Sequence, residues 1–149
     1  MLNKLQKLRE ERAQGDKGFT LIELLVVVVI IGILIAIAIP LYLNYQKGAK
    51  NKGTQSDVRA AVSTIEQCYT DNANAYPTAI VGVGTPVTSY TVTGCSGSTI
   101  NVSTGTTLAY TQLPSGCTGT ACTGYSIVGT QSATSKTYTY NSTAGGQIS

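Results

Sequence analysis

One uninterrupted apolar segment limits what this chain can fold into. Residues 24–39 read LLVVVVIIGILIAIAI and contain no polar side chain. With its flanks the segment covers residues 19–43, which as a helix would be about 37 Å long, against a hydrocarbon core of about 30 Å in a bilayer. Val and Ile also suit a buried strand, but this length favours a membrane helix. We therefore expect residues 19–43 to form one membrane-spanning helix.

The segment before the apolar run is polar and charged. Residues 1–18 carry five basic and three acidic side chains, a net charge of +2. By the positive-inside rule the N-terminus stays in the cytoplasm and the C-terminal region lies outside. An ordinary secretory signal is cut after its apolar part. Here the only feature suited to cleavage, Gly18, precedes the apolar part, so we expect residues 1–18 to be a leader of a different kind.

Beyond Pro40 the apolar residues recur at three- and four-residue steps, which is the spacing of an amphipathic helix. This helix is expected to end near Asn72, because turn-forming residues and Pro77 follow. Residues 44–76 are therefore predicted to hold the amphipathic half of the helix and its end. The residues of the apolar face are Val58, Ala61, Val62, Ile65, Cys68 and Tyr69.

Residues 77–149 differ in composition, being rich in Thr, Ser, Gly, Val and Tyr. Short runs of β-forming residues alternate there with turn residues. We expect an α+β fold in which the long N-terminal helix packs on a small antiparallel β-sheet. The predicted strands are 88–93, 107–113, 124–129 and 136–141.

The charged residues exclude several classes of function. Of the seventeen, only Lys136 lies beyond Asp71. The net positive charge is not gathered in a clustered basic face, so it does not indicate nucleic-acid binding. Whether the chain binds nucleic acid is left open. The chain has no histidine, and it shows no nucleophile–base pair, phosphate loop or metal-ligand cluster. We expect no catalytic activity, metal or cofactor.

Four cysteines, all in the exported part, predict two disulfides in an oxidising compartment. Four cysteines allow three pairings, and spacing alone leaves them open. We expect Cys68–Cys95, because Cys68 lies late in the helix and the bridge would join helix to sheet. Cys117–Cys122 would then be the second pair.

The most informative site surrounds the start of the apolar segment. Gly18 has no side chain, so a protease can approach its peptide bond closely. Cleavage there would create an α-amino group on Phe19, which is positively charged near neutral pH. Glu23, four residues further on, is the only acidic or basic side chain in residues 19–43. A carboxylate near the membrane core usually marks a function with a nearby partner, and the new amine on Phe19 is the obvious one.

The segment KGFTLIELLVVVVIIGILIAIAIP resembles the class III signal of type IV prepilins and type II secretion pseudopilins. The resemblance implies that a prepilin peptidase cuts after Gly18 and methylates Phe19, and that Glu23 acts in filament assembly. It also matches Gly32 and Pro40, where the membrane helix of that family bends or locally melts in the filament. The likeness is strong over residues 17–46 and looser beyond them.

The resemblance implies a structural subunit of a type IV pilus. Its partners would be copies of itself, the peptidase, the assembly machinery and, before assembly, membrane lipid. The subunit would begin as a single-pass precursor in the cytoplasmic membrane and end in an extracellular filament serving adhesion, motility or DNA uptake. A pseudopilin of a type II secretion system is the alternative. A membrane-tethered enzyme or adhesin fits less well, because such an anchor needs no Gly18, Phe19 and Glu23 pattern.

Overall fold

The computed structural model describes residues 18–84 and 86–149. The chain divides into two units, which meet between Tyr42 and Leu43 and are described separately. The expected leader, residues 1–18, lies outside the described residues except for Gly18. The second unit, Leu43–Ser149, is called the head below.

A single helix, α2, runs from Leu21 to Asp71 and is 51 residues long. It continues through Gly32 and Pro40 without a break. From Leu21 to Lys50 every side chain is exposed. Within the described residues α2 is the one helix long and apolar enough to cross a membrane, with a mean hydropathy of 3.4 over its most apolar window.

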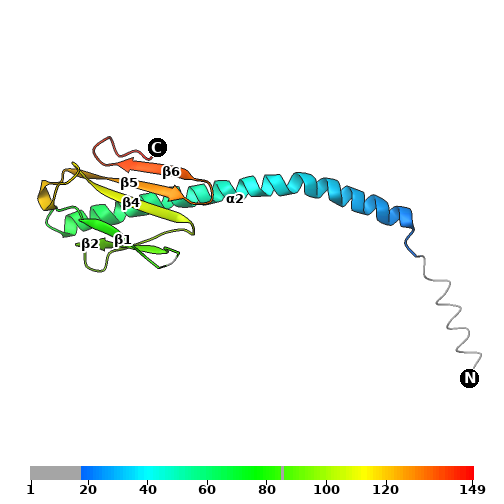
Figure 1. Cartoon of the computed structure of the whole chain (residues 1–149), viewed down its shortest axis with the longest axis horizontal. Coiled ribbons are helices and arrows are strands. Elements are labelled where there is room, and N and C mark those ends of the chain that lie inside the picture. The colour runs from blue at the N-terminus through cyan, green and yellow to red at the C-terminus, as the bar shows by residue number, and fades with distance from the viewer. Residues whose placement is uncertain (1–17, 85) are drawn as a thin grey trace, which may run out of the picture. The chain divides into compact units, whose positions relative to one another are not determined.

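In the head, α2 buries one face. Val58, Ala61, Ile65 and Cys68 are buried, as their spacing predicts, whereas Val62 and Tyr69 are only partly covered. They pack against apolar residues of the strands, and Figure 1 shows β4 and β5 lying along this half of the helix. The strand residues of this core are Tyr90, Val92, Ile100, Leu108, Tyr125 and Ile127.

Six strands form two antiparallel sheets, and the α+β fold class is confirmed. One sheet has the order β1-β2-β3, and the other has the order β4-β5-β6. The sequence predicted one sheet and did not predict β1 or β3. The strands are β1 (Ala79–Val83), β2 (Ser89–Thr93), β3 (Thr99–Asn101), β4 (Thr106–Leu113), β5 (Gly124–Gln131) and β6 (Lys136–Asn141).

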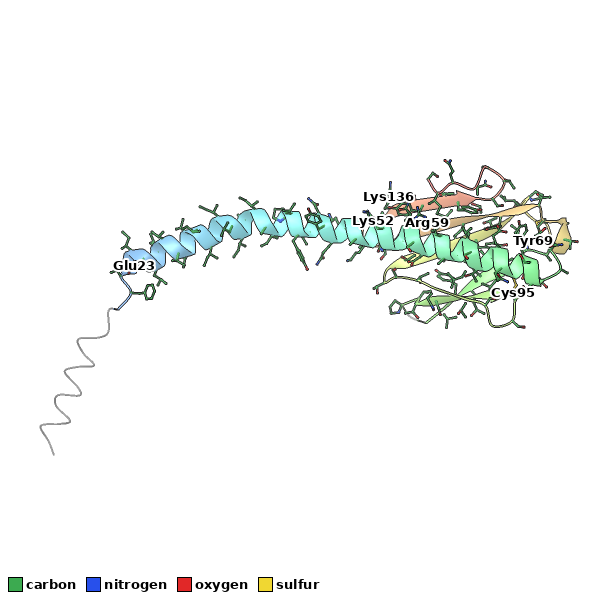
Figure 2. All side chains as sticks on the ribbon, turned by 180° about the vertical axis from the view of Figure 1, so that it is seen from behind. Glu23, Lys52, Arg59, Tyr69, Cys95 and Lys136 are labelled. Carbon is green, nitrogen blue, oxygen red and sulfur yellow. A yellow bond between two sulfur atoms is a disulfide. The ribbon has the colours of Figure 1, made fainter. Side chains whose placement is uncertain are left out.

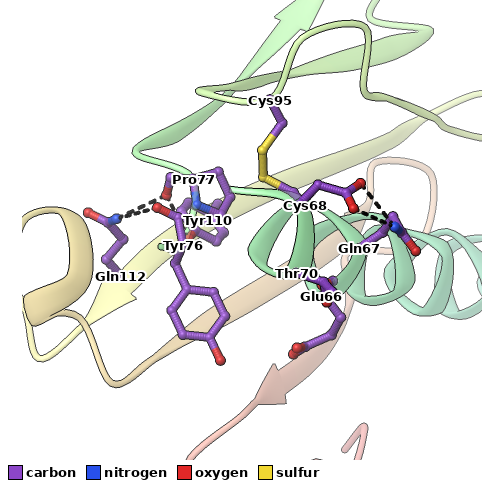
Figure 3. Close-up of a disulfide and its surroundings, with 10 residues drawn as sticks. Glu66, Gln67, Cys68, Thr70, Tyr76, Pro77, Cys95, Tyr110 and Gln112 are labelled. Carbon is purple, nitrogen blue, oxygen red and sulfur yellow. Dashed lines mark hydrogen bonds between the residues drawn. A yellow bond between two sulfur atoms is a disulfide. The ribbon is translucent and has the colours of Figure 1, made fainter. Parts of the chain in front are cut away.

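Side chains join the two sheets where no backbone ladder does. The Tyr90 hydroxyl on β2 accepts a hydrogen bond from the Leu108 amide of β4 at 2.8 Å. Tyr110 on β4 donates its hydroxyl to the Pro77 carbonyl at 2.8 Å. The Gln112 amide donates to the same carbonyl at 3.0 Å, as Figure 3 shows. The backbone amide of Leu108 and the backbone carbonyl of Pro77 are thus paired with side chains. In a single continuous sheet, a neighbouring strand would have paired them.

A glycine in β5 allows α2 to approach the second sheet closely. A Cβ atom on Gly129 would collide with Val58, and it would lie 3.3 Å from a methyl group of Thr54. Because the neighbouring atoms belong to the buried face of the helix, they have no room to move aside. The close contact between α2 and β5 therefore requires glycine at this position.

Buried polar groups fix α2 at the end of the head where the helix enters. The hydroxyls of Thr54 and Thr106 are 2.8 Å apart, and the Gln131 amide donates to Thr54 at 3.2 Å. Nearby, Asp57 accepts hydrogen bonds from the amide and the hydroxyl of Ser103, at 2.8 and 3.1 Å. These bonds satisfy groups that would otherwise be costly to bury, and they set the register between helix and strands.

Candidate functional site

The expected cleavage site lies in exposed, non-helical chain just before α2. Gly18, Phe19 and Thr20 have no regular structure, and Phe19 is 86% exposed. A Cβ atom on Gly18 would meet no other atom within 4 Å. Nothing in the described part of the chain therefore packs against this glycine, and a larger side chain there would not disturb the described fold.

Glu23 lies in the first turn of α2 and is bonded to Thr20 (Glu23 is labelled in Figure 2). The Glu23 carboxylate accepts hydrogen bonds from the Thr20 amide and the Thr20 hydroxyl, both at 2.8 Å. In return the Glu23 amide donates to the Thr20 hydroxyl oxygen at 3.3 Å. This reciprocal pair is a capping box, which satisfies amides that the first turn of a helix leaves unpaired.

Thr20 is the residue of this site that the sequence analysis did not single out. The signal was present, because a threonine followed three residues later by a glutamate marks a helix N-terminus. Thr20 directly follows Phe19, and its hydrogen bonds hold the Glu23 carboxylate at the N-terminal end of α2. The structure therefore brings Phe19, Thr20 and Glu23 together at one helix end.

The apolar part of α2 presents its side chains outward all around the helix. Leu21, Ile22 and Leu34 are 83%, 68% and 61% exposed, and Gly32 has nothing within 4 Å of its Cβ position. A helix that is apolar on all sides is stable only in lipid or inside a protein assembly. The bend expected at Gly32 and Pro40 stays a prediction, because α2 is continuous there.

Two disulfides join the four cysteines, with the pairing expected from the sequence. Cys68 on α2 is bonded to Cys95, which follows β2, and their Cα atoms are 5.7 Å apart (Figure 3). Cys117 is bonded to Cys122 across the short 3-10 helix Gly119–Ala121, with Cα atoms 5.2 Å apart. The first bridge ties the end of α2 to the first sheet, and the second closes a small loop between β4 and β5.

Tyrosines cluster near the C-terminal end of α2. The rings of Tyr69 and Tyr76 are stacked with centroids 4.4 Å apart, and the fully buried Tyr125 lies 5.1 Å from Tyr76. Tyr125 donates its hydroxyl to the Glu66 carboxylate at 2.7 Å. Burial raises the pKa of Tyr125 far above its ordinary value, and the hydrogen bond to Glu66 raises it further. Burial raises the pKa of Tyr110 in the same way.

The described residues contain no group of three or more His, Cys, Asp or Glu side chains that could hold a metal ion. The carboxylates of the head have other partners. Asp57 binds Ser103, Glu66 binds Tyr125, and Asp71 accepts two hydrogen bonds from Gln67. The features with functional character are therefore the helix start, the exposed apolar helix and the surface of the head.

Comparison with known proteins confirms the resemblance found at the helix start. The family described as the prokaryotic N-terminal methylation motif matches residues 14–39, which include Gly18, Phe19 and Glu23. This motif and the relatives described next support a type IV pilin or pseudopilin. That family is structural and not enzymatic.

Its relatives come from both branches of that family. The chain is 48% identical over 60 residues to the type IV major fimbrial protein FimA of Dichelobacter nodosus, covering 40% of this chain and 38% of the relative. It is 35% identical over 77 residues to the type II secretion system core protein G of Klebsiella michiganensis, covering 52% and 54%. The chain thus spans about two fifths to a half of the length of these relatives. No solved structure matches.

Proposed function

We propose that this chain is the precursor of a structural subunit of a type IV pilus. A prepilin peptidase cuts it between Gly18 and Phe19 and methylates Phe19. The processed chain stays in the cytoplasmic membrane through α2 until the assembly machinery adds it to an extracellular filament. The observation that carries the proposal is the N-terminal methylation motif over residues 14–39, whose Gly18 and Phe19 are exposed just before an all-apolar helix.

The physical logic of assembly follows from that helix. In the membrane, lipid would cover the exposed side chains of residues 21–43. Leaving the lipid is favourable only where other apolar helices replace it, so the helices of neighbouring copies would pack together as the core of the filament.

Glu23 links processing to this packing. Before cleavage the nitrogen of Phe19 is a neutral amide, and afterwards it is an amine with a pKa of about 7.7–8.0 in model peptides. A cationic amine then lies beside the carboxylate that the capping box holds, in the same copy or in a neighbour. Because the positive charge appears only on cleavage, an uncut chain would lack the partner that Glu23 needs in an apolar core.

A pseudopilin of a type II secretion system is the second candidate. It is favoured by the core protein G of Klebsiella michiganensis, whose match covers 52% of this chain. The assembly chemistry at Phe19 and Glu23 would be the same in both cases. Deletion of the gene distinguishes them, because it removes surface filaments seen by electron microscopy if the chain is a pilus subunit, and protein export if it is a pseudopilin.

N-terminal sequencing and intact-mass measurement of the processed protein test the proposal. We expect the mature chain to begin at Phe19 and to carry one added methyl group. Gly18→Leu should leave the full-length precursor in the membrane, because the leucine side chain obstructs the protease. Gly48→Leu is the matched control, since Gly48 is also open to solvent and should be processed normally. A mature N-terminus at another residue would overturn the proposal.

A further inference from the structure

The exposed charged side chains of the head are basic near one end of its helical part and acidic at the other. Lys52, Arg59 and Lys136 lie near the end where the helix enters, and Figure 2 shows them together, away from Tyr69 and Cys95. Contacts of the turn that precedes β6 support this placement. Thr134 in that turn is hydrogen-bonded to Asn51, and Gln131 at the end of β5 donates to the Lys50 carbonyl at 3.5 Å. We call Lys52, Arg59 and Lys136 the basic end.

One carboxylate of the head is exposed, and it lies at the other end of α2. Asp71 is in the last turn, nineteen residues after Lys52, which corresponds to about 28 Å along a helix. Asp57 is only 8% exposed and binds Ser103, whereas Glu66 is half-buried and binds Tyr125. Asp71 is therefore the carboxylate of the head that another molecule can reach.

The position of Asp71 is unfavourable for its own helix. The C-terminus of a helix carries partial negative charge and prefers Lys or Arg, yet the last turn of α2 has no basic residue. The Gln67 amide at 2.9 Å is a neutral donor and does not balance the charge. A residue that opposes a local preference points to a requirement outside its own element. A cation from another molecule would meet that requirement.

The basic end has a groove suited to receive a side chain. It has a volume of about 510 Å³ and lies between α2 and the C-terminal residues. Apolar contacts are available from Val62 and Ile148, and Arg59 supplies the positive charge. The full lining is Arg59, Val62, Tyr140, Gly146, Gln147 and Ile148.

We propose that the head binds a second copy of itself head to tail, with Asp71 of one copy seated at the basic end of the next, against Arg59. This inference rests on the proposed filament and names a contact within it. Copies that point the same way along a filament turn the C-terminal end of α2 of one toward the basic end of another. Such heterologous contacts continue from copy to copy without closing, as a filament requires. The charge pair selects partner and register and adds modestly to affinity.

Charge reversal in the full-length chain, expressed with its assembly machinery, tests this contact. Asp71→Lys should reduce the yield of sheared filaments about ten-fold, because it places a cation opposite Arg59 at each contact. Arg59→Glu should do the same by placing a carboxylate opposite Asp71. The double variant Asp71→Lys with Arg59→Glu restores an attractive pair and should recover most of the yield. Asp71→Lys puts a favourable cation in the last turn of α2, so the head should stay folded.

The control is Thr91→Lys, at an exposed position on β2. It raises the net charge by one, as Asp71→Asn does by removing a negative charge at the helix end. Thr91→Lys should leave filaments normal, whereas Asp71→Asn should reduce them. The inference is overturned if Asp71→Lys keeps normal filaments, or if the double variant assembles no better than the single ones. Loss with Arg59→Glu alone would instead assign the basic end to another anion, such as a lipid headgroup. If the wild-type chain forms no filaments, the proposed function itself fails.

Discussion

At the scale of the residue, the Glu23 carboxylate has two interaction partners under the proposed function. Glu23 closes the capping box with Thr20, and under the proposed function it also attracts the amine of Phe19. The first role belongs to the helix and needs only a hydrogen-bond acceptor. The second role belongs to assembly and needs a negative charge. Substitutions that change one property at a time separate the two.

We predict that Glu23→Gln and Glu23→Ala will both be processed and membrane-located but will form few or no filaments. Glutamine keeps an acceptor for the capping box and loses the charge, whereas alanine loses both. Deleting one member of a desolvated charge pair typically costs about 3–5 kcal/mol, more than the roughly 0.5–2 kcal/mol of a lost cap. Filament counts by electron microscopy and immunoblots of processing check this.

The two variants also give the contrary result a definite meaning. Normal filaments from Glu23→Gln, with few from Glu23→Ala, would show that Glu23 acts through the cap and not through its charge. An unprocessed product from both would instead place Glu23 in recognition by the protease.

At the scale of the element, the sequence predicted α2 better than the sheets. Spacing identified four of the six buried residues of α2, because the three- and four-residue period is local, but it missed the polar Thr54 and Asp57. β3 has only three residues, too few for a recognisable pattern. β1 does not alternate, since Val81, Gly82 and Val83 are all exposed. The arrangement of two sheets could not be predicted, because the sheets are joined by hydrogen bonds between distant parts of the chain. One example is the bond from the Leu108 amide to the Tyr90 hydroxyl.

The site was predictable to a similar degree. Gly18, Phe19 and Glu23 stand in a short linear motif, so they could be found without any fold. Thr20 was overlooked although its spacing to Glu23 is a known helix signal. The grouping of Lys136 with Lys52 and Arg59 could not be predicted, because it depends on the position of the β5–β6 turn against α2.

The two disulfides should stabilise the head unequally. Cys68–Cys95 spans 27 residues and Cys117–Cys122 spans 5. Loop-closure entropy then gives about 3–4 kcal/mol for the first and about 2 kcal/mol for the second. We predict that Cys68→Ser with Cys95→Ser will lower the free energy of unfolding more than Cys117→Ser with Cys122→Ser does.

Urea unfolding of the detergent-solubilised chain, followed by circular dichroism, measures the difference. Peptide mapping without reductant should first show both pairs and no free thiol in the wild-type chain. A larger loss from the Cys117 and Cys122 variant, or a bridge such as Cys95–Cys117, would contradict this assignment.

At the scale of the whole molecule, the two units meet different environments. The apolar half of α2 is exposed along its whole length. Under the proposed function, this surface exchanges lipid for the helices of other copies. Under the proposed function, the head has to remain folded outside the cell without partners inside its core. Its stability comes from two disulfides, a buried polar network around Thr54 and Asp57, and a tyrosine cluster centred on Tyr125.

The tyrosine cluster predicts how the stability of the head depends on pH. The pKa values of Tyr76, Tyr110 and Tyr125 are raised in the folded head, mainly by burial. Above about pH 10 the unfolded chain releases these protons while the folded head retains them, so the unfolded state gains. We therefore expect the free energy of unfolding to be constant from about pH 8 to about pH 9 and to fall steadily above about pH 10.

Urea titrations at several pH values measure this slope. Tyr125→Phe should make the slope shallower, because it removes one of the protons that the folded head retains. Tyr45→Phe, at a side chain 72% exposed, should not change it. A slope that is the same in all three proteins would rule out Tyr125 as its source.

The buried bonds between α2 and the strands have a mechanical consequence. Pulling on a filament would load each head through its helix, and β4 and β5 lie along that helix (Figure 1). The attachments from Thr54 to the Cys68–Cys95 bridge are spread over about 21 Å of helix, so a tensile force would be shared among them in shear. Bonds loaded side by side rupture together, whereas bonds loaded one at a time unzip at low force. In the proposed filament, the head would therefore resist being pulled from its helix under tension.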